Sequence, residues 1–243
     1  MRIYTAVGRI HNSSFQVLGR SHSGGTAPGL YLHQSERDIV STRENSEWTG
    51  IRGKIGAWLL DNPLRKRREA RFLDLVLESI RGNETVLDVG AGSGFFSIPV
   101  AQKLKTGSVV CLDLSPEMLA RLQKKVERLG LTDRVRIAQS EASSSGLPGE
   151  SVDVVISNAV LHELPNPKAV LKEIARVLKP GGSVMIKDFN KDSLQGKIVS
   201  LFHHKDEQGP FTPNELKNCL TEMGLRDIKT IPIKGSFIAT ARK

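Results

Sequence analysis

Apolar positions along most of the chain follow two alternating patterns. Short, mostly apolar runs are typical of buried strands, and longer segments with apolar residues every three or four positions are typical of amphipathic helices. The strands are predicted at residues 85–89, 108–112, 134–138, 152–157, 182–187, 227–231 and 236–240. The helices are predicted at residues 63–80, 95–104, 116–129, 167–178 and 212–223. Because strand and helix alternate, the pattern predicts a parallel sheet with helices on both faces.

Cap and turn residues refine this picture. Ser115 and Pro116 are suited to open the helix that follows, because Ser caps a helix N-terminus and Pro fits its first turn. The link 232–235 between the last two strands is too short for a crossover, so these strands must form an antiparallel hairpin. The predicted fold is therefore α/β, a Rossmann-like three-layer sandwich around a seven-stranded, mostly parallel sheet whose last strand is antiparallel.

Residues 1–45 differ from the rest of the chain. They show no sustained periodicity, are rich in Ser, Gly, His and Arg, and contain no acidic residue before Glu36. We interpret them as a weakly ordered arm, but the composition also fits an organelle-targeting segment or translation from an upstream start codon. The predicted organisation is an arm at 1–45, an N-terminal helical segment at 46–82 and a main domain at 83–243.

The formal net charge of the 243-residue chain is +9. Residues 1–82 hold 13 basic and 8 acidic side chains, or +5, and residues 83–243 hold 22 and 18, or +4. This excess permits RNA or another anionic partner without requiring one. The basic run 65–68 is either a solvated helix face or a contact for such a partner. No apolar run is long enough to span a bilayer as a helix, so we expect no membrane span.

The strongest chemical signal is a glycine-rich turn after the first predicted strand of the main domain. Gly90, Gly92 and Gly94 follow the apolar strand 85–89 and precede a helix. Glycine lets the backbone turn sharply and approach a ligand without a Cβ in the way. In a parallel sheet this turn lies at the carboxyl ends of the strands, where ligands bind. Alone, the motif fits NAD, FAD or S-adenosylmethionine.

Two carboxylates narrow the choice of ligand. Asp113 ends the next strand, where an acidic residue accepts hydrogen bonds from ribose hydroxyls. Asp88 lies two residues before Gly90, where it would repel a pyrophosphate and attract an ammonium or sulfonium group. The register is Gly-x-Gly-x-Gly, without the Gly-x-Gly-x-x-Gly spacing of dinucleotide sites. These features favour methyl transfer over hydride transfer.

At residues 63–243 the chain resembles the class I S-adenosylmethionine-dependent methyltransferases. Four blocks carry the resemblance, at 86–96, 110–118, 151–164 and 171–185. The subgroup that looks most similar includes the ubiquinone and menaquinone C-methyltransferases and many small-molecule methyltransferases. The resemblance implies S-adenosyl-L-methionine as cofactor, a small-molecule acceptor and a cytoplasmic monomer or homodimer.

The resemblance also implies roles for single residues. The loop around the methionine part of the cofactor would consist of Asp88, Gly90, Gly92 and Gly94. The ribose and adenine would contact Asp113, Leu114, Met118, Glu141 and Ala142. Asn158 would line the cofactor near the reacting methyl group. The alternative for Asp88 and Asp113 is a solvated loop or helix-cap carboxylate, and for Glu141 a different register after its strand.

His162 borders the region where related enzymes hold the acceptor. It is either a general base, because a histidine titrates near neutral pH, or a structural histidine beside the pocket. Glu163 is interpreted as its solvated neighbour. Methyl transfer is a direct in-line displacement that depends mainly on proximity and orientation, so a strong base is not required.

Other features separate acceptor classes. The stretch 157–160 lacks the Asn/Asp-Pro-Pro-Tyr/Phe motif typical of base-amino methylation, and 158–164 differs from the quinone C-methyltransferases. Cys111 and Cys219 are too few and too far apart for a disulfide framework, a zinc site or an arsenic site. We expect 48–60 and the loop 189–210 to cover the acceptor. We assign no metal, and interpret 203–207 as a solvated loop.

Three functions are consistent with these patterns. The first is a small-molecule methyltransferase. The second is an RNA- or protein-modifying methyltransferase guided by the basic N-terminal third. The third is a non-catalytic scaffold with the same fold, against which the intact glycines and carboxylates argue.

Overall fold

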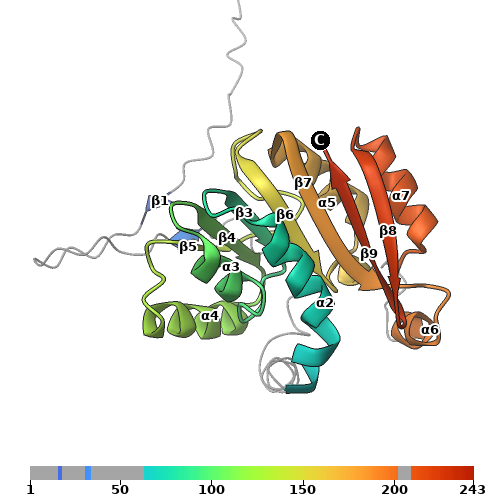
Figure 1. Ribbon diagram of the computed structural model, residues 1–243, viewed down its shortest axis with the longest axis horizontal. Helices are drawn as coiled ribbons and strands as arrows, with labels where there is room; N and C mark the ends of the chain where they lie inside the picture. The colour runs from blue at the N-terminus through green and yellow to red at the C-terminus, as the bar shows by residue number, and fades with distance from the viewer. Residues whose placement is uncertain (1–15, 18–30, 34–62, 202–208) are drawn as a thin grey trace, which may run out of the picture.

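The computed structural model describes residues 16–17, 31–33, 63–201 and 209–243. One sheet with the strand order β1-β2-β5-β4-β3-β6-β7-β9-β8 runs through the molecule (Figure 1). Its strands are β1 Gln16–Val17, β2 Tyr31–His33, β3 Thr85–Val89, β4 Ser108–Asp113, β5 Val135–Gln139, β6 Val152–Asn158, β7 Leu178–Phe189, β8 Arg226–Ile233 and β9 Ser236–Arg242. The seven strands β3 to β9 are those predicted from the sequence.

Strand directions confirm the predicted fold class. The strands β5, β4, β3, β6 and β7 pair in parallel, and β9 is antiparallel to both β7 and β8. The chain places β4 and β5 on one side of β3, and then β6 and β7 on the other. This reversal opens a crevice outside the carboxyl ends of β3 and β6, the usual ligand site of an open α/β sheet.

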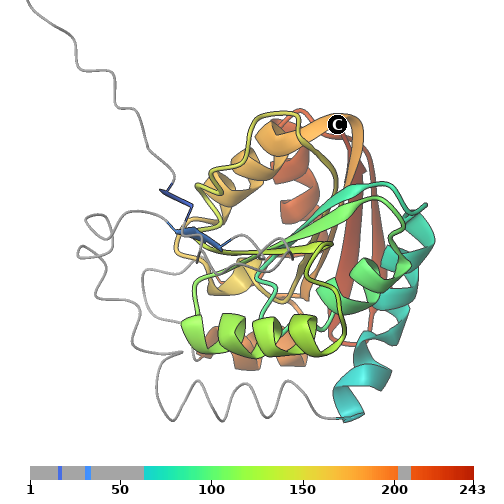
Figure 2. The same ribbon diagram turned by 90° about the vertical axis from the view of Figure 1, so that its left-hand side faces the viewer.

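Helices cover both faces of this sheet (Figure 2). One face carries α2 Pro63–Ser79, α3 Ser97–Lys103 and α4 Pro116–Arg128. The other face carries α5 Pro167–Val177 and α7 Pro213–Glu222. Ser115 and Asn166 cap α4 and α5 as N-caps, each followed by a proline, and a capping box with Thr212 and Glu215 opens α7.

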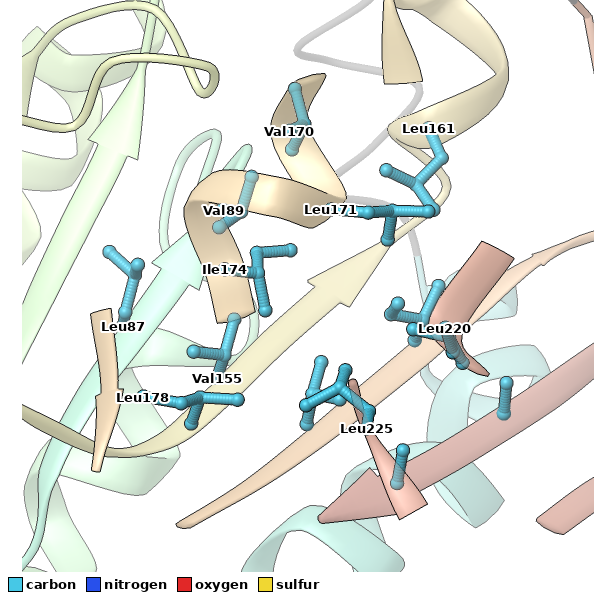
Figure 3. Close-up of a cluster of buried hydrophobic side chains, with 14 of the residues drawn as sticks. Leu87, Val89, Val155, Leu161, Val170, Leu171, Ile174, Leu178, Leu220 and Leu225 are labelled. Atoms are coloured by element: carbon cyan, nitrogen blue, oxygen red, sulfur yellow. The ribbon is translucent and has the colours of Figure 1, made fainter. Parts of the chain in front are cut away.

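Each face has its own apolar core. On the α5/α7 face, apolar side chains of β3 and β6 pack against α5 and α7 (Figure 3). On the α2/α3/α4 face, Phe72 and Val76 of α2 are fully buried, and the Phe72 ring meets Phe96 edge to face with centroids 5.2 Å apart. Burial of this kind stabilises by about 25 cal/mol per Å² of apolar surface, so the two cores fix the strand ends that carry the site.

Two short strands lie in the region interpreted as an arm. β1 pairs antiparallel with β2, and β2 pairs in parallel with β5. Neither strand was predicted within residues 1–45, because runs of two or three residues carry no readable period. The rest of 1–45 and all of 46–62, including Trp48 and Trp58, lie outside the described residues.

Two element boundaries differ markedly from the prediction, and one helix was not predicted. The helix predicted from residue 95 begins at Ser97, because Phe96 supplies no side-chain cap and the turn continues through the glycine motif. β7 begins at Leu178, since Val152 pairs with Leu178 while Val154 pairs with Ser183, and the residues between form a bulge. Between β7 and α7 the structure adds α6 Leu194–Leu201.

The helix α6 was not predicted, and two of its apolar residues are exposed. Leu194 is 76% exposed and Ile198 is 46% exposed, so no apolar stripe faces the core. Residues 202–208, with the His-rich stretch 203–207, lie outside the described residues. In the described part of the chain no helix is long and apolar enough to cross a membrane.

Candidate active site

The glycine loop connects β3 to α3 at the carboxyl edge of the sheet. Gly90, Gly92 and Gly94 all have positive φ, at 72°, 53° and 86°. A Cβ added to Gly90 would lie 2.2 Å from Val160 Cγ2, and one added to Gly94 would lie 2.4 Å from Leu122 Cδ1. A Cβ on Gly92 would meet nothing within 4 Å. Gly90 and Gly94 are therefore needed for packing, while Gly92 borders open space.

Asp88 lies at the base of this loop. Its side chain is buried, and the Ser97 hydroxyl at the start of α3 donates a hydrogen bond to Asp88 Oδ2. Asp88 pairs in register with Cys111 of β4, and its charge adds to the burial that raises the pKa of the Cys111 thiol. Asp88 is thus a buried carboxylate held by α3, which argues against the solvated-loop alternative.

Asp113, at the end of β4, ties the glycine loop to α4. Asp113 Oδ2 accepts a hydrogen bond of 2.8 Å from the Gly92 amide, and Oδ1 accepts one of 2.8 Å from the Ser115 amide. Burial raises the pKa of Asp113, and the nearby charge of Glu163 adds to this, although the two amide hydrogen bonds oppose it. The carboxylate is therefore fixed directly beside the loop and close to Glu163.

The remaining residues predicted to bind the cofactor differ in their exposure and in their contacts with the glycine loop. Leu114 is 44% exposed beside Asp113, whereas Met118 in α4 is buried. Glu141 is exposed just beyond β5, and its Oε2 accepts a hydrogen bond of 3.4 Å from the Ser143 hydroxyl. Ala142 is half-buried against the core of the α5/α7 face. Glu141 and Ala142 thus have fewer links to the glycine loop than Asp113 has.

Asn158 ends β6 beside Lys187 of β7. The two residues are register partners, and Lys187 Nζ lies 3.4 Å from Asn158 Oδ1. The same ammonium lies 2.7 Å from Glu69 Oε2 on α2. Because side chains alternate along a strand, Asn158 and Asp88 face the α2/α3/α4 side, together with the core residues Ile156 and Val86.

His162 belongs to a closed hydrogen-bond network on the other side. It lies in the 3₁₀ turn η2 Leu161–Glu163 and is 4% exposed. His162 Nδ1 is 2.6 Å from Asp188 Oδ1, and its amide donates to Asp188 Oδ2 at 3.1 Å. Nε2 lies 3.6 Å from Glu163 Oε1, and the ring meets Phe189 edge to face.

The protonation of His162 follows from this network. Burial lowers the pKa of the imidazole, but the hydrogen bonds and charges of Asp188 and Glu163 outweigh burial and raise the pKa to about 10. The ring is therefore protonated at neutral pH and has no free nitrogen to accept a proton. This geometry favours the structural interpretation of His162 over the general base.

Several residues of the site were not found from the sequence. Ser97 holds Asp88, Val160 packs over Gly90, and Asp188 pairs with His162. Lys125 of α4 donates to the Ser93 carbonyl oxygen at 3.0 Å and so braces the glycine loop from a second helix. Of these residues only Asp188 has a signal in the sequence, since it directly follows the apolar strand predicted at 182–187, as Asp113 directly follows the one predicted at 108–112.

Metal and thiol chemistry have little support in the described residues. No group of three His, Cys, Asp or Glu side chains there could hold a metal ion. Cys111 is fully buried in β4, and Cys219 is buried in α7. A cavity of about 400 Å³ lies between α5 and α7, lined in part by Lys168, Phe211 and Cys219. None of the predicted site residues lines this cavity.

Comparison with known proteins agrees with this geometry. Residues 87–186 match the model of the methyltransferase domain family. The chain is 32% identical over 164 residues to the ubiquinone biosynthesis O-methyltransferase of Xanthomonas oryzae pv. oryzae, covering 66% of this chain and 63% of that protein. It is 32% identical over 162 residues to the arsenite methyltransferase of Halobacterium salinarum, covering 61% of this chain and 39% of that protein.

A solved structure extends the similarity over more of the chain. The crystal structure of a SAM-dependent methyltransferase from Aquifex aeolicus superposes with a TM-score of 0.62 and 28% identity, covering 77% of this chain and 96% of that one. The chain spans less than half the length of several curated relatives that it matches. The sheet order, the glycine loop with its two carboxylates and these similarities support the class I S-adenosylmethionine-dependent methyltransferase superfamily for this chain.

Proposed function

We propose that this chain transfers a methyl group from S-adenosylmethionine to a small-molecule acceptor. The observation that carries the proposal is the loop Gly90–Gly94, held between two carboxylates at the carboxyl ends of β3 and β4. Gly92 leaves room where a side chain would fill the crevice, and its amide is already fixed by Asp113. A glycine loop flanked by two carboxylates suits a cationic nucleoside better than a pyrophosphate, because the carboxylates attract the first and repel the second.

Within this proposal each predicted residue has a role. Asp88 and the glycines hold the methionine part of the cofactor, and Asp113 accepts from the ribose hydroxyls. Leu114 offers an exposed apolar surface for the adenine. Glu141 and Ala142 take the adenine edge, and Asn158 lies toward the reacting methyl group.

The chain contributes orientation more than chemistry. The bound cofactor supplies a methyl group on a sulfonium, which is already a good leaving group. The residues around the crevice bring the acceptor into line with that methyl group and exclude water, and such positioning accounts for a large part of the rate acceleration. His162 is proposed to shape the crevice wall through η2, because its ring nitrogens are engaged with Asp188 and Glu163.

A small-molecule acceptor is favoured over RNA by the relatives, whose names refer to ubiquinone biosynthesis and arsenite. Arsenite itself is a poor candidate for this chain. Soft metalloids are bound by several thiolates, and both cysteines here are buried on separate elements, with burial raising the pKa of each thiol. The cytoplasmic location and the monomeric or dimeric state stay predictions from the sequence.

Calorimetric titration tests the cofactor first. The purified chain is expected to bind S-adenosylmethionine and not NAD. A panel of phenolic, amino and carboxylic acceptors is then screened for release of S-adenosylhomocysteine, with salt-dependent binding of RNA measured in parallel. Binding of NAD in place of S-adenosylmethionine would contradict the proposal, and RNA-dependent turnover would replace the small-molecule acceptor by RNA.

A further inference from the structure

A buried ion pair joins α2 to the end of β7. Lys187 Nζ and Glu69 Oε2 are 2.7 Å apart, and the two side chains are only 6% and 3% exposed. On α2, Glu69 is buried on the same helix face as Phe72 and Val76, so the ion pair lies within an otherwise apolar surface. A buried ion pair rarely stabilises a fold more than apolar residues do, so its presence calls for another explanation.

The position of Lys187 supplies that explanation. Its register partner is Asn158, the residue proposed to lie nearest the reacting methyl group, and Nζ is 3.4 Å from Asn158 Oδ1. The Lys187 carbonyl oxygen also accepts a hydrogen bond of 2.8 Å from the Ala159 amide. The ammonium therefore lies at the carboxyl end of β6, on the same face as Asp88.

We propose that Glu69 is an electrostatic positioning residue that allows the crevice to accept a positively charged cofactor. This inference rests on the proposed function. Without Glu69, the ammonium of Lys187 would be an uncompensated positive charge beside a sulfonium. With Glu69 paired to it, Lys187 can hold Asn158 Oδ1, which leaves the Asn158 amide N–H groups to face the crevice.

The charge of the ligand makes the inference testable. S-adenosylmethionine and S-adenosylhomocysteine have the same adenosine, ammonium and carboxylate groups, but only the first carries the sulfonium charge. At an effective dielectric constant of about 20, two unit charges several ångströms apart interact strongly enough to change affinity about tenfold. If the charge of Lys187 is no longer compensated, the affinity for S-adenosylmethionine must therefore fall more than the affinity for S-adenosylhomocysteine.

The variant Glu69→Gln removes the charge and keeps the shape and the hydrogen-bond acceptor. By calorimetry at pH 7, its affinity for S-adenosylmethionine is expected to fall about tenfold. Its affinity for S-adenosylhomocysteine is expected to change less than about twofold. In the double variant Glu69→Gln/Lys187→Gln both charges are absent, and the ratio of the two affinities is expected to return to that of the unmodified chain. Because the ratio is measured within one protein, a general loss of stability cancels.

The matched control is Glu173→Gln. Glu173 is a buried carboxylate paired with Arg176 at 2.7 Å, but on α5, on the opposite face of the sheet. This variant is expected to lower the thermal midpoint and to leave the affinity ratio unchanged. An equal loss of both ligands in Glu69→Gln, or no change, would overturn the inference. If the unmodified chain bound neither compound, the proposed function would fail first, and the inference with it.

Discussion

Two carboxylate clusters lie at the carboxyl edge of the sheet, and they differ in what they leave open. Around Asp113 the glycine loop borders free space at Gly92, and Leu114 is 44% exposed. Around Asp188 the imidazole of His162 is 4% exposed and both ring nitrogens face carboxylates. A ligand site needs open space and polar groups that can still form hydrogen bonds. In a structural network the side chains fill the space and bind one another. The contrast supports our proposal that the residues around Asp113 bind the ligand and that the pair of His162 and Asp188 has a structural role.

The largest effect is expected in the cluster of His162, Glu163 and Asp188, which we call the closed cluster; the open cluster is the glycine loop with Asp113 and Leu114. His162→Gln leaves Asp188 buried without a charged partner, which typically costs about 3 to 5 kcal/mol of unfolding free energy. We expect this loss in urea unfolding, while kcat measured below the new melting temperature stays within about threefold of the unmodified chain. A loss of kcat above a hundredfold in a stably folded variant would restore His162 as the general base.

The pH dependence of stability examines the same cluster. In the folded chain the pKa of His162 is about 10, against 6.5 for the free group. The protonated ring therefore stabilises the fold fully below about pH 6.5, and this contribution is lost as the pH rises toward about 10. The difference in unfolding free energy between the unmodified chain and His162→Gln should shrink steadily across that interval. A constant difference would show that the ring is neutral in the folded state.

A somewhat smaller effect is expected at the packed part of the open cluster. Gly90→Ala combines a φ of 72° with a Cβ only 2.2 Å from Val160 Cγ2. Backbone strain and overpacking together should cost about 3 kcal/mol of unfolding free energy and abolish calorimetric cofactor binding. The control Gly130→Ala has a φ of 65° and no atom within 4 Å of its added Cβ, so it reports strain alone. Equal losses in the two variants would refute the contact with Val160.

The smallest effects separate residues within the open cluster. Asp113→Ala should weaken S-adenosylmethionine binding at least about tenfold, or about 1.4 kcal/mol, because the ribose and the Gly92 amide both lose their acceptor. Glu141→Ala, at an exposed position, should change affinity no more than about twofold. Unchanged affinity in Asp113→Ala would contradict the placement of the ribose, and a larger loss in Glu141→Ala would exchange the two roles.

Much of the fold could be predicted because its elements have strong local signals. The seven strands β3 to β9 come from clearly apolar runs. The helices α4, α5 and α7 combine a helical period with a Ser, Asn or Thr cap and a following proline. The helix α6 lacks a buried stripe, and β1 and β2 are too short to show a period. Their formation depends on tertiary contacts that no local pattern encodes.

Only those site residues could be predicted that lie in the glycine motif or directly at the end of a predicted strand. Asp88, the three glycines and Asp113 occupy strand ends, and their meeting follows from parallel topology. The pairings of Glu69 with Lys187 and of His162 with Asp188 join residues 118 and 26 positions apart. Each pairing depends on side-chain geometry across two elements. This geometry is not visible in the sequence, so His162 was considered as a general base although both its ring nitrogens face carboxylates in the fold.

The outer strand β8 has a consequence for self-association. It ends the sheet, and its exposed residues include Arg226 and Lys229, with Pro232, which has no N–H to offer, further along. A second copy adding its own β8 alongside would find charged side chains on this strand and no N–H to donate at Pro232. This border therefore disfavours edge-to-edge pairing of β8 with the β8 strand of a second molecule.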